Sequence, residues 1–292
     1  MEALAGISRN RLSVTGLVLV ALLGATYAET FYWMVDRWLA PSSYYSHGFI
    51  VPLVSIWMVW KERQKLAALP LAPSVWGWLF LATGLGVHLV SLFLRVHFTS
   101  GVTLPWVIFG AVLFLFGREH ARQLRLPIVF SLFMIPLPMA VIEKLAFRLK
   151  LIATESSVWI ASQVGWATES RGSLIYLPSG ETLIVGDVCS GLRSLIALLT
   201  LGFLFATAFS RLSVPRRVLL FVLSVPIAVA SNVVRLVSLC ALGHYVSAEF
   251  ASGPAHYAFG FGIYIVALGL LFLTERALSE RKRPEKPVGE AS

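Results

Sequence analysis

Long apolar runs separated by short polar segments make up most of the chain. A run of roughly 20 apolar residues is long enough to cross the hydrocarbon core of a bilayer as a helix. The pattern therefore predicts an all-α polytopic membrane protein with about eight transmembrane helices. The expected helices cover residues 12–33, 48–60, 75–94, 101–116, 126–142 and 190–210, a segment that starts near Val218, and residues 256–274.

Three stretches depart from this simple pattern. Residues 126–142 hold three prolines, and because proline interrupts a helix we expect this crossing to be irregular. Residues 145–164 mix charged and apolar positions at helical spacing, which favours an amphipathic helix on the outer membrane surface. Residues 174–185 form two β-favouring runs around Pro178-Ser179-Gly180, which predicts a small extracytoplasmic β-hairpin.

Composition and charge fit a membrane protein. Hydrophobic residues make up 57% of the 292 residues and charged residues 13%, which excludes a soluble domain. The formal charge of +9 comes from Lys and Arg in short loops and in the tail, so it indicates cytoplasmic segments rather than a nucleic-acid partner. We expect both termini in the cytoplasm and a first span that is retained as an anchor. Lys144, Arg148 and Lys150 would face outward, against the charge rule.

The predicted domain organisation is simple. Residues 1–276 form one polytopic domain whose chemistry-bearing motifs fall within residues 186–260. Residues 277–292 are polar and rich in basic residues, which predicts a disordered cytoplasmic tail.

Two cysteines occur in the chain, and they imply no disulfide framework. Cys240 lies within an apolar helix, so we interpret it as a packing residue. Cys189 stands where a polar segment gives way to the apolar run of residues 190–210. The positive end of a helix dipole and Arg193, one turn later, would there favour a reactive thiolate. A buried cysteine is more often inert, so Cys189 by itself leaves the packing alternative open.

An arginine inside an apolar helix is energetically costly and usually functional. Counting about 20 residues from Val218 places Arg235 near the outer boundary of the membrane, at the expected level of Cys189. Asn232 lies one turn away on the same helix face and can orient the guanidinium. The structural alternative is that Arg235 reaches lipid headgroups or pairs with a nearby carboxylate.

A histidine completes a candidate catalytic set. His256 opens the last expected span at the same outer boundary, and imidazole takes up and returns protons near neutral pH. A thiol, a guanidinium and an imidazole in one layer would supply nucleophile, oxyanion stabiliser and acid–base group for acyl transfer. His244 and His47 compete with His256 for the last role. No pair of histidine or cysteine has the spacing of a metal site, so we expect no metal and no cofactor.

These residues stand in motifs that resemble those of the exosortase/archaeosortase family. In chain order the motifs are Cys189-Ser190-Gly191-Leu192-Arg193, Asn232-Val233-Val234-Arg235, and His256 followed by Gly260. Tyr45-Ser46-His47-Gly48 resembles the amino-terminal signature of the family, and Leu177-Pro178-Ser179-Gly180 resembles its hairpin before the cysteine. The similarity extends from about Ser42 to Gly260.

The resemblance implies a thiol protease or transpeptidase of the PEP-CTERM protein-sorting system. Such an enzyme recognises a C-terminal Pro-Glu-Pro motif and transmembrane span on exported proteins, cleaves there, and transfers the acyl group to an acceptor such as a lipid-linked or polysaccharide group. It would act beside exopolysaccharide synthesis in the bacterial inner membrane, with its active site at the periplasmic face. By this resemblance Cys189 is the nucleophile, Arg235 the catalytic arginine and His256 the third member. The supporting or substrate-binding positions are Arg193, Asn232, Ser190, Gly191 and His47.

Two alternatives compete with this hypothesis. In a non-enzymatic or glycan-handling protein of exopolysaccharide assembly, Arg193, Arg235 and His256 would bind an anionic lipid-linked sugar while Cys189 merely packs. A transporter is disfavoured, because the polar residues cluster at one membrane face and the sequence shows no internal repeat. The need for sulfur at Cys189 separates the enzyme from the glycan-handling protein.

Overall fold

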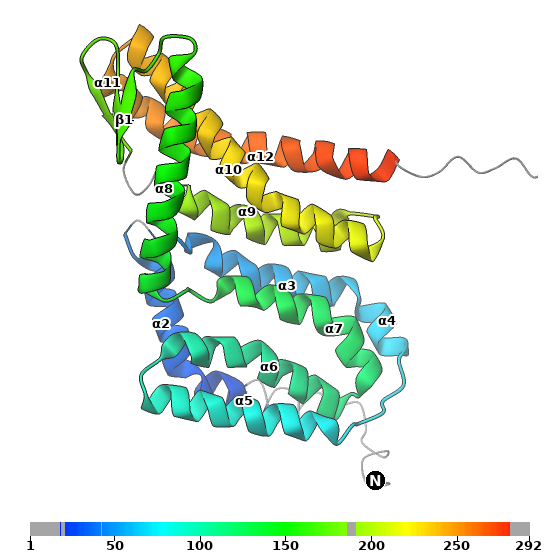
Figure 1. The fold of residues 1–292 in the computed structure, drawn as a ribbon. Helices are drawn as coiled ribbons and strands as arrows, with labels where there is room; N and C mark the ends of the chain where they lie inside the picture. The colour runs from blue at the N-terminus through cyan, green and yellow to red at the C-terminus, as the bar shows by residue number, and fades with distance from the viewer. Residues whose placement is uncertain (1–17, 19–20, 42, 186–190, 281–292) are drawn as a thin grey trace, which may run out of the picture. The chain divides into compact units, whose positions relative to one another are not determined.

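The computed structural model describes residues 18, 21–41, 43–185 and 191–280. Contacts divide the chain into two compact units, Met1–Pro136 and Leu137–Ser292. Figure 1 shows the helices and strands of both units. The prediction of one polytopic domain over residues 1–276 is not tested by this division, and the last helix continues past that boundary to Glu280.

Helices make up the described part of the first unit. Its longest helices, α5 and α6, form a hairpin in which small residues allow close approach. A Cβ atom at Gly110 would lie 2.7 Å from the Cβ of Phe80, and one at Gly77 would collide with the backbone of Phe114. The elements are α2 (Ala28–Leu39), η2 (Ser46–Phe49), α3 (Ile50–Lys61), α4 (Arg63–Ala68), α5 (Trp76–Phe93), α6 (His97–Leu115), α7 (Arg118–Phe130) and η3 (Ser131–Met134).

A buried polar network ties α5 and α6 to α2 and the residue just before it. The Tyr27 hydroxyl lies 2.8 Å from Thr103 Oγ1, and His88 Nδ1 lies 2.9 Å from Ser100 Oγ. Thr30 also hydrogen-bonds to Ser100 through its hydroxyl. All five side chains are buried, and each polar group finds its partner on another segment of the unit. The network therefore fixes how these helices pack, as side-chain hydrogen bonds do between membrane helices.

The second unit consists of long helices and a small sheet. Figure 1 shows α9, α10 and α12 running alongside one another, while α8 crosses them near the sheet. The sheet is antiparallel in the order β1-β2-β3, so it has one strand more than the expected hairpin. The elements are α8 (Met139–Ser162), β1 (Glu169–Arg171), β2 (Leu174–Tyr176), β3 (Thr182–Ile184), α9 (Leu192–Leu204), η5 (Phe205–Phe209), α10 (Val214–Tyr245), α11 (Ala248–Ser252) and α12 (Pro254–Glu280).

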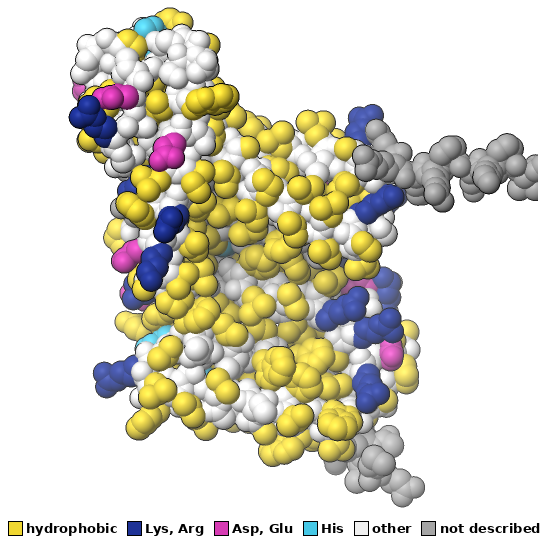
Figure 2. All heavy atoms as spheres, in the orientation of Figure 1, with side chains coloured by type: hydrophobic (Ala, Val, Ile, Leu, Met, Phe, Trp, Pro, Cys, Tyr) yellow, Lys and Arg dark blue, Asp and Glu magenta, His cyan; other side chains and the backbone are white. Residues whose placement is uncertain are grey.

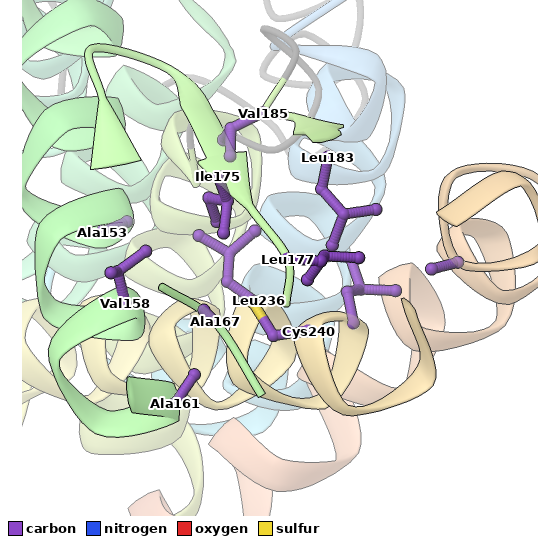
Figure 3. Close-up of a cluster of buried hydrophobic side chains, with 12 residues drawn as sticks. Ala153, Val158, Ala161, Ala167, Ile175, Leu177, Leu183, Val185, Leu236 and Cys240 are labelled. Atoms are coloured by element: carbon purple, nitrogen blue, oxygen red, sulfur yellow. The ribbon is translucent and has the colours of Figure 1, made fainter. Parts of the chain in front are cut away.

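A hydrophobic core lies beneath the sheet. Figure 3 shows Ile175 and Leu183 of the sheet pointing toward Leu236 and Cys240 of α10. Cys240 is fully buried in this cluster, which confirms that it is a packing residue. The sheet is thereby fixed on the C-terminal part of α10.

Within the described residues, five helices are long and apolar enough to cross a membrane, or up to six if the broken pair of residues 118–134 and 139–162 counts as one span. The segments expected at residues 75–94, 101–116, 190–210, from Val218 and at 256–274 therefore contain helices that fit a membrane crossing, and the total of eight is not confirmed. The five helices are Trp76–Phe93, His97–Leu115, Leu192–Phe209, Val214–Tyr245 and Ala258–Ser279.

The remaining expected crossings differ from the prediction for physical reasons. Helix α3 is about 18 Å long, shorter than the roughly 30 Å hydrocarbon core, so residues 48–60 are not confirmed as a span. The crossing at 126–142 is indeed irregular, because helical structure stops at Met134 and α8 starts at Met139, after Pro136 and Pro138. The predicted end at residue 142 is wrong. The expected first span lies partly outside the described residues.

Helix α8 is the counterpart of the expected amphipathic helix, although it starts six residues before the predicted residue 145, at Met139. Its buried side chains, among them Ala153, Ser157 and Ala161, face α10 and the sheet. Lys144 and Arg148 are exposed. In the second unit α8 runs across the spanning helices rather than along them (Figure 1), and its position on a membrane surface stays a prediction.

Basic side chains collect at particular helix ends, as Figure 2 shows over α4 and α7. In the second unit Arg216 and Arg217 lie in the first turn of α10, whereas the sheet packs on the last turns of that helix. Hydrogen bonds hold α9, α10 and α12 together at the basic end, from Ser210 to Glu275 and from Arg216 to the carbonyl of Leu278. Arg216 and Arg217 therefore lie at the end of α10 opposite the sheet.

Candidate active site

The candidate site begins with one buried face of α10. Asn232 and Arg235 are 2% and 6% exposed, and the same face continues through Leu236, Leu239 and Cys240 toward the sheet. The helix has 32 residues and is about 48 Å long, which exceeds the roughly 30 Å hydrocarbon core. The helix is therefore longer than the apolar layer, and Arg235 lies about 15 Å along the axis from its end at Tyr245.

The start of α9 packs directly against this face. Gly191 precedes the helix with φ +77°, a left-handed conformation that favours glycine. Its carbonyl accepts hydrogen bonds from the Leu195 amide at 2.8 Å and the Ser194 hydroxyl at 2.9 Å. A Cβ atom at Gly191 would lie only 2.7 Å from Nδ2 of Asn232. Both the backbone conformation and the lack of space therefore require glycine at this position.

Helix α12 supplies the third side. His256 lies in its first turn, and Gly260 follows one turn later. Nη2 of Arg235 lies 3.5 Å from the position that a Cβ atom of Gly260 would take, so the guanidinium covers this glycine. Gly260 thus leaves the space that the planar guanidinium occupies between α10 and α12.

Arg193 brings a second guanidinium to the same region. It lies in the first turn of α9 and is half-buried. The phenol of Tyr264 on α12 is within electrostatic range of both Arg193 and Arg235. The structure therefore gathers residues of three sequence motifs, Gly191 and Arg193, Asn232 and Arg235, and Gly260, where α9, α10 and α12 meet.

Some predicted site residues cannot be placed in this way. Cys189 and Ser190 lie outside the described residues, and of His256 only the backbone position in α12 is described. Their roles, and the expected approach of thiol and imidazole to Arg235, stay predictions. The competing His244 is exposed, contacts the ring of Tyr245, and lies about 13 Å along the axis of α10 from Arg235.

His47 belongs to the first unit. Gly48 beside it packs against the indole of Trp38, and a Cβ atom there would collide with that ring. Trp38 donates a hydrogen bond to the carbonyl of Met134 at 2.8 Å. Burial lowers the pKa of the His47 imidazole, and a hydrogen bond to the backbone carbonyl of Phe133 offsets part of this shift. The motif around His47 therefore has a clear packing function, and its supporting role in a reaction stays a prediction.

Sequence reasoning missed Tyr264. The signal was present, because His256, Gly260 and Tyr264 follow one another at intervals of four residues and so share one face of a helix. A tyrosine in an apolar segment is ordinary by composition. Its place beside α9 and α10 becomes visible only when α12 packs against these helices.

These features define a class of protein: a polytopic membrane protein with a buried cationic site near one end of its spanning helices. Residues 33–273 match the family model described as transmembrane exosortase (Exosortase_EpsH), and the chain belongs to this family. No curated protein and no solved structure matches the chain.

Proposed function

We propose that the protein is a membrane-embedded cysteine transpeptidase or protease that cleaves a C-terminal sorting signal on exported proteins. Membership of the exosortase family supports this proposal. The observation that carries it is the convergence of the motifs: Asn232 packs on Gly191, two residues after Cys189, and Arg235 covers Gly260, one turn after His256. A guanidinium held in this way is suited to stabilising negative charge in a site with little water.

The chemistry follows the usual course of nucleophilic acyl transfer. The Cys189 thiolate attacks the peptide carbonyl, and the carbonyl electron pair moves onto oxygen, where Arg235 stabilises the oxyanion. As the carbonyl re-forms, the C–N bond breaks, and His256 gives a proton to the leaving amine. The resulting thioester is attacked by an acceptor nucleophile or by water, which loses its proton to His256, and Cys189 leaves as a thiolate.

The substrate class follows from the resemblance in the motifs. We expect exported proteins that end in a Pro-Glu-Pro motif, an apolar span and a basic cluster, with a lipid-linked or polysaccharide group as one possible class of acceptor. The apolar span would lie beside the enzyme in the bilayer and bring the cleavage site to the level of Arg235. We place the enzyme in the bacterial inner membrane with both termini in the cytoplasm and the active site at the periplasmic face.

Replacement of Cys189 tests the proposal. Cys189→Ala and Cys189→Ser should reach the membrane at normal abundance and fail to process a substrate protein, which is read as a size shift on a blot. Cys240→Ala is the matched control, because it removes the buried thiol of the sheet core and should leave processing intact. Normal processing by Cys189→Ala would contradict the enzyme and favour the glycan-handling alternative.

A further inference from the structure

A strongly basic surface lies over α4 and α7 of the first unit (Figure 2). Arginines at intervals of four and three residues share one face of α7, and all of them are exposed. They are Arg118, Arg122 and Arg125. The buried His120 and Pro127 lie on the other side of the helix. The first turns of α7 therefore present a stripe of positive charge to the surroundings.

The end of α3 and the start of α4 add the exposed cations Lys61, Arg63 and Lys65. Lys65 pairs with Glu62 at 2.7 Å, and the same carboxylate accepts a hydrogen bond from the side-chain amide of Gln123 at 2.9 Å. Gln123 belongs to α7, so this contact holds the start of α4 against α7. The cations of both elements therefore belong to one surface, which we call the basic surface.

The arginines of α7 have no counter-charge in the part of the chain that the structure describes. None of the three forms an ion pair or a side-chain hydrogen bond with a described residue. Of the two carboxylates in these segments, Glu62 already pairs with Lys65, which leaves only Glu119. Exposed charge of one sign attracts partners of the opposite sign. The basic surface therefore favours an anionic partner.

Tryptophan rings lie directly beside these cations. The Arg63 guanidinium lies 4.1 Å from the centre of the Trp60 ring, and the Lys61 ammonium lies 5.3 Å from that of Trp57. Both rings are exposed. Tryptophan is enriched at lipid headgroups, because the indole has an apolar body and a polar N–H group. The combination fits the headgroup layer of a membrane better than a soluble acidic partner.

The basic surface also adjoins the end of the α5–α6 hairpin, whose helices are long and apolar enough to cross a membrane. Two residues separate the end of α6 from Arg118, and Gly117 pairs with Ala72 just before α5. Helix α5 begins with the exposed Trp76 and Trp78. The stripe on α7 spans about 10 Å, and arginine side chains can reach back to the boundary over such a distance. The arginines are thus placed for contact with headgroups.

We propose that the basic surface binds the headgroups of anionic phospholipids, with Arg118, Arg122 and Arg125 as the main phosphate contacts. A planar guanidinium can donate to two phosphate oxygens at once. The neighbouring tryptophans favour a partner that belongs to a bilayer. This inference goes beyond the proposed reaction and does not depend on it, because lipid binding needs neither Cys189 nor a protein substrate.

Removal of the three α7 charges tests the proposal. Purified full-length protein in detergent is titrated with phosphatidylglycerol or phosphatidylcholine, and native mass spectrometry measures the bound lipid. The wild type should prefer phosphatidylglycerol. The triple variant Arg118→Gln, Arg122→Gln and Arg125→Gln should bind it about 10²-fold more weakly, since each basic residue beside anionic lipid contributes about fivefold. Unchanged binding in this variant would overturn the proposal.

A matched variant separates this surface from overall charge. The triple variant Arg37→Gln, Lys144→Gln and Arg148→Gln removes the same charge from exposed positions on α2 and α8. It should keep the preference for phosphatidylglycerol. An equal loss in both triple variants would show that net charge explains the binding, and the proposal would be wrong. Because only exposed side chains change, both variants should unfold at the temperature of the wild type.

Competing anions identify the source of the phosphate. Inorganic phosphate at constant ionic strength should leave phosphatidylglycerol bound, because it offers no apolar contact to the tryptophans. Complete displacement by inorganic phosphate would indicate a site for a free anion and contradict the proposal. Displacement by polyglutamate would indicate an acidic protein partner and contradict it too. Added salt should weaken phosphatidylglycerol binding more in the wild type than in the α7 variant, as expected for exposed charges.

Discussion

Both units bury polar side chains, but of different kinds. In the first unit the buried groups are hydroxyls and the imidazoles of His88 and His120, and some of them bond to one another, as Thr30 and His88 do around Ser100. In the second unit the buried groups include Asn232 and the guanidinium of Arg235. Neutral, mutually satisfied groups hold membrane helices together at modest cost. A guanidinium among apolar helices is far more costly, so its retention points to chemistry rather than to assembly.

The difference predicts which substitutions impair the reaction and which impair only the fold. Changes around Arg235 should affect processing beyond any effect on stability. Changes around Ser100 should affect stability and leave the rate constant of the folded enzyme unchanged. The following variants test the comparison at the places where the two units differ most.

The largest effect is expected at Arg235. Arg235→Lys keeps the charge and loses the planar fork, and a lysine does not cover Gly260 in the same way. We expect kcat to fall by at least about 10²-fold, which is the usual cost of losing an oxyanion donor. Purified variants are assayed on a substrate with its sorting signal, after the amount in the membrane is shown to be normal. Arg148→Lys on exposed α8 is the control, and an equal loss there would contradict a special role of Arg235.

A smaller effect is expected at Gly191, where the start of α9 meets Asn232. Gly191→Ala strains a left-handed residue by about 1–2 kcal/mol and also pushes against the amide of Asn232. Gly180→Ala is the matched control, because Gly180 has φ +83° with no atom within 4 Å of its Cβ position. Thermal unfolding should show the backbone strain in both variants and a larger destabilisation in Gly191→Ala, which also has the contact with Asn232. Processing should fall in Gly191→Ala alone, and equal processing in the two would show that the contact with Asn232 is not needed.

The smallest effect on the reaction is expected at Ser100. Ser100→Ala removes a partner from both Thr30 and His88, which should lower the free energy of unfolding by about 1–3 kcal/mol. The midpoint of thermal unfolding, followed by tryptophan fluorescence, measures this loss. Ser162→Ala, which removes a partly exposed hydroxyl that bonds only within the last turn of α8, should change this midpoint much less. A large fall in kcat of folded Ser100→Ala would erase the distinction between the two units.

Much of this architecture can be read from the sequence, because hydrophobic runs determine which segments cross a membrane. The runs at residues 75–94 and 190–210 correspond closely to the observed helices. Strand β1 (Glu169–Arg171) could not be found, because Glu-Ser-Arg has no apolar alternation and pairs with β2 only in the folded protein. The division of the chain into two units also has no counterpart in the hydropathy pattern.

The motifs Gly191 and Arg193, Asn232 and Arg235, and Gly260 could be picked out from the sequence, but their contacts could not. Helical depth placed Arg235 near the start of α9 and α12, because residue counting works along straight helices. The contacts of Asn232 with Gly191 and of Arg235 with Gly260 depend on how the helices pack, which the sequence does not specify. Tyr264 was missed for the same reason, since its neighbours lie on other helices.

The most direct test of the account is to detect the acyl-enzyme itself. Purified protein is mixed with substrate, quenched in acid and analysed by mass spectrometry for a thioester on the peptide that contains Cys189. The account predicts this adduct, its release by hydroxylamine, a strongly reduced yield in Arg235→Lys, and its absence in Cys189→Ala. Efficient cleavage of the substrate with no adduct on Cys189, and with full activity of Cys189→Ala, would contradict it.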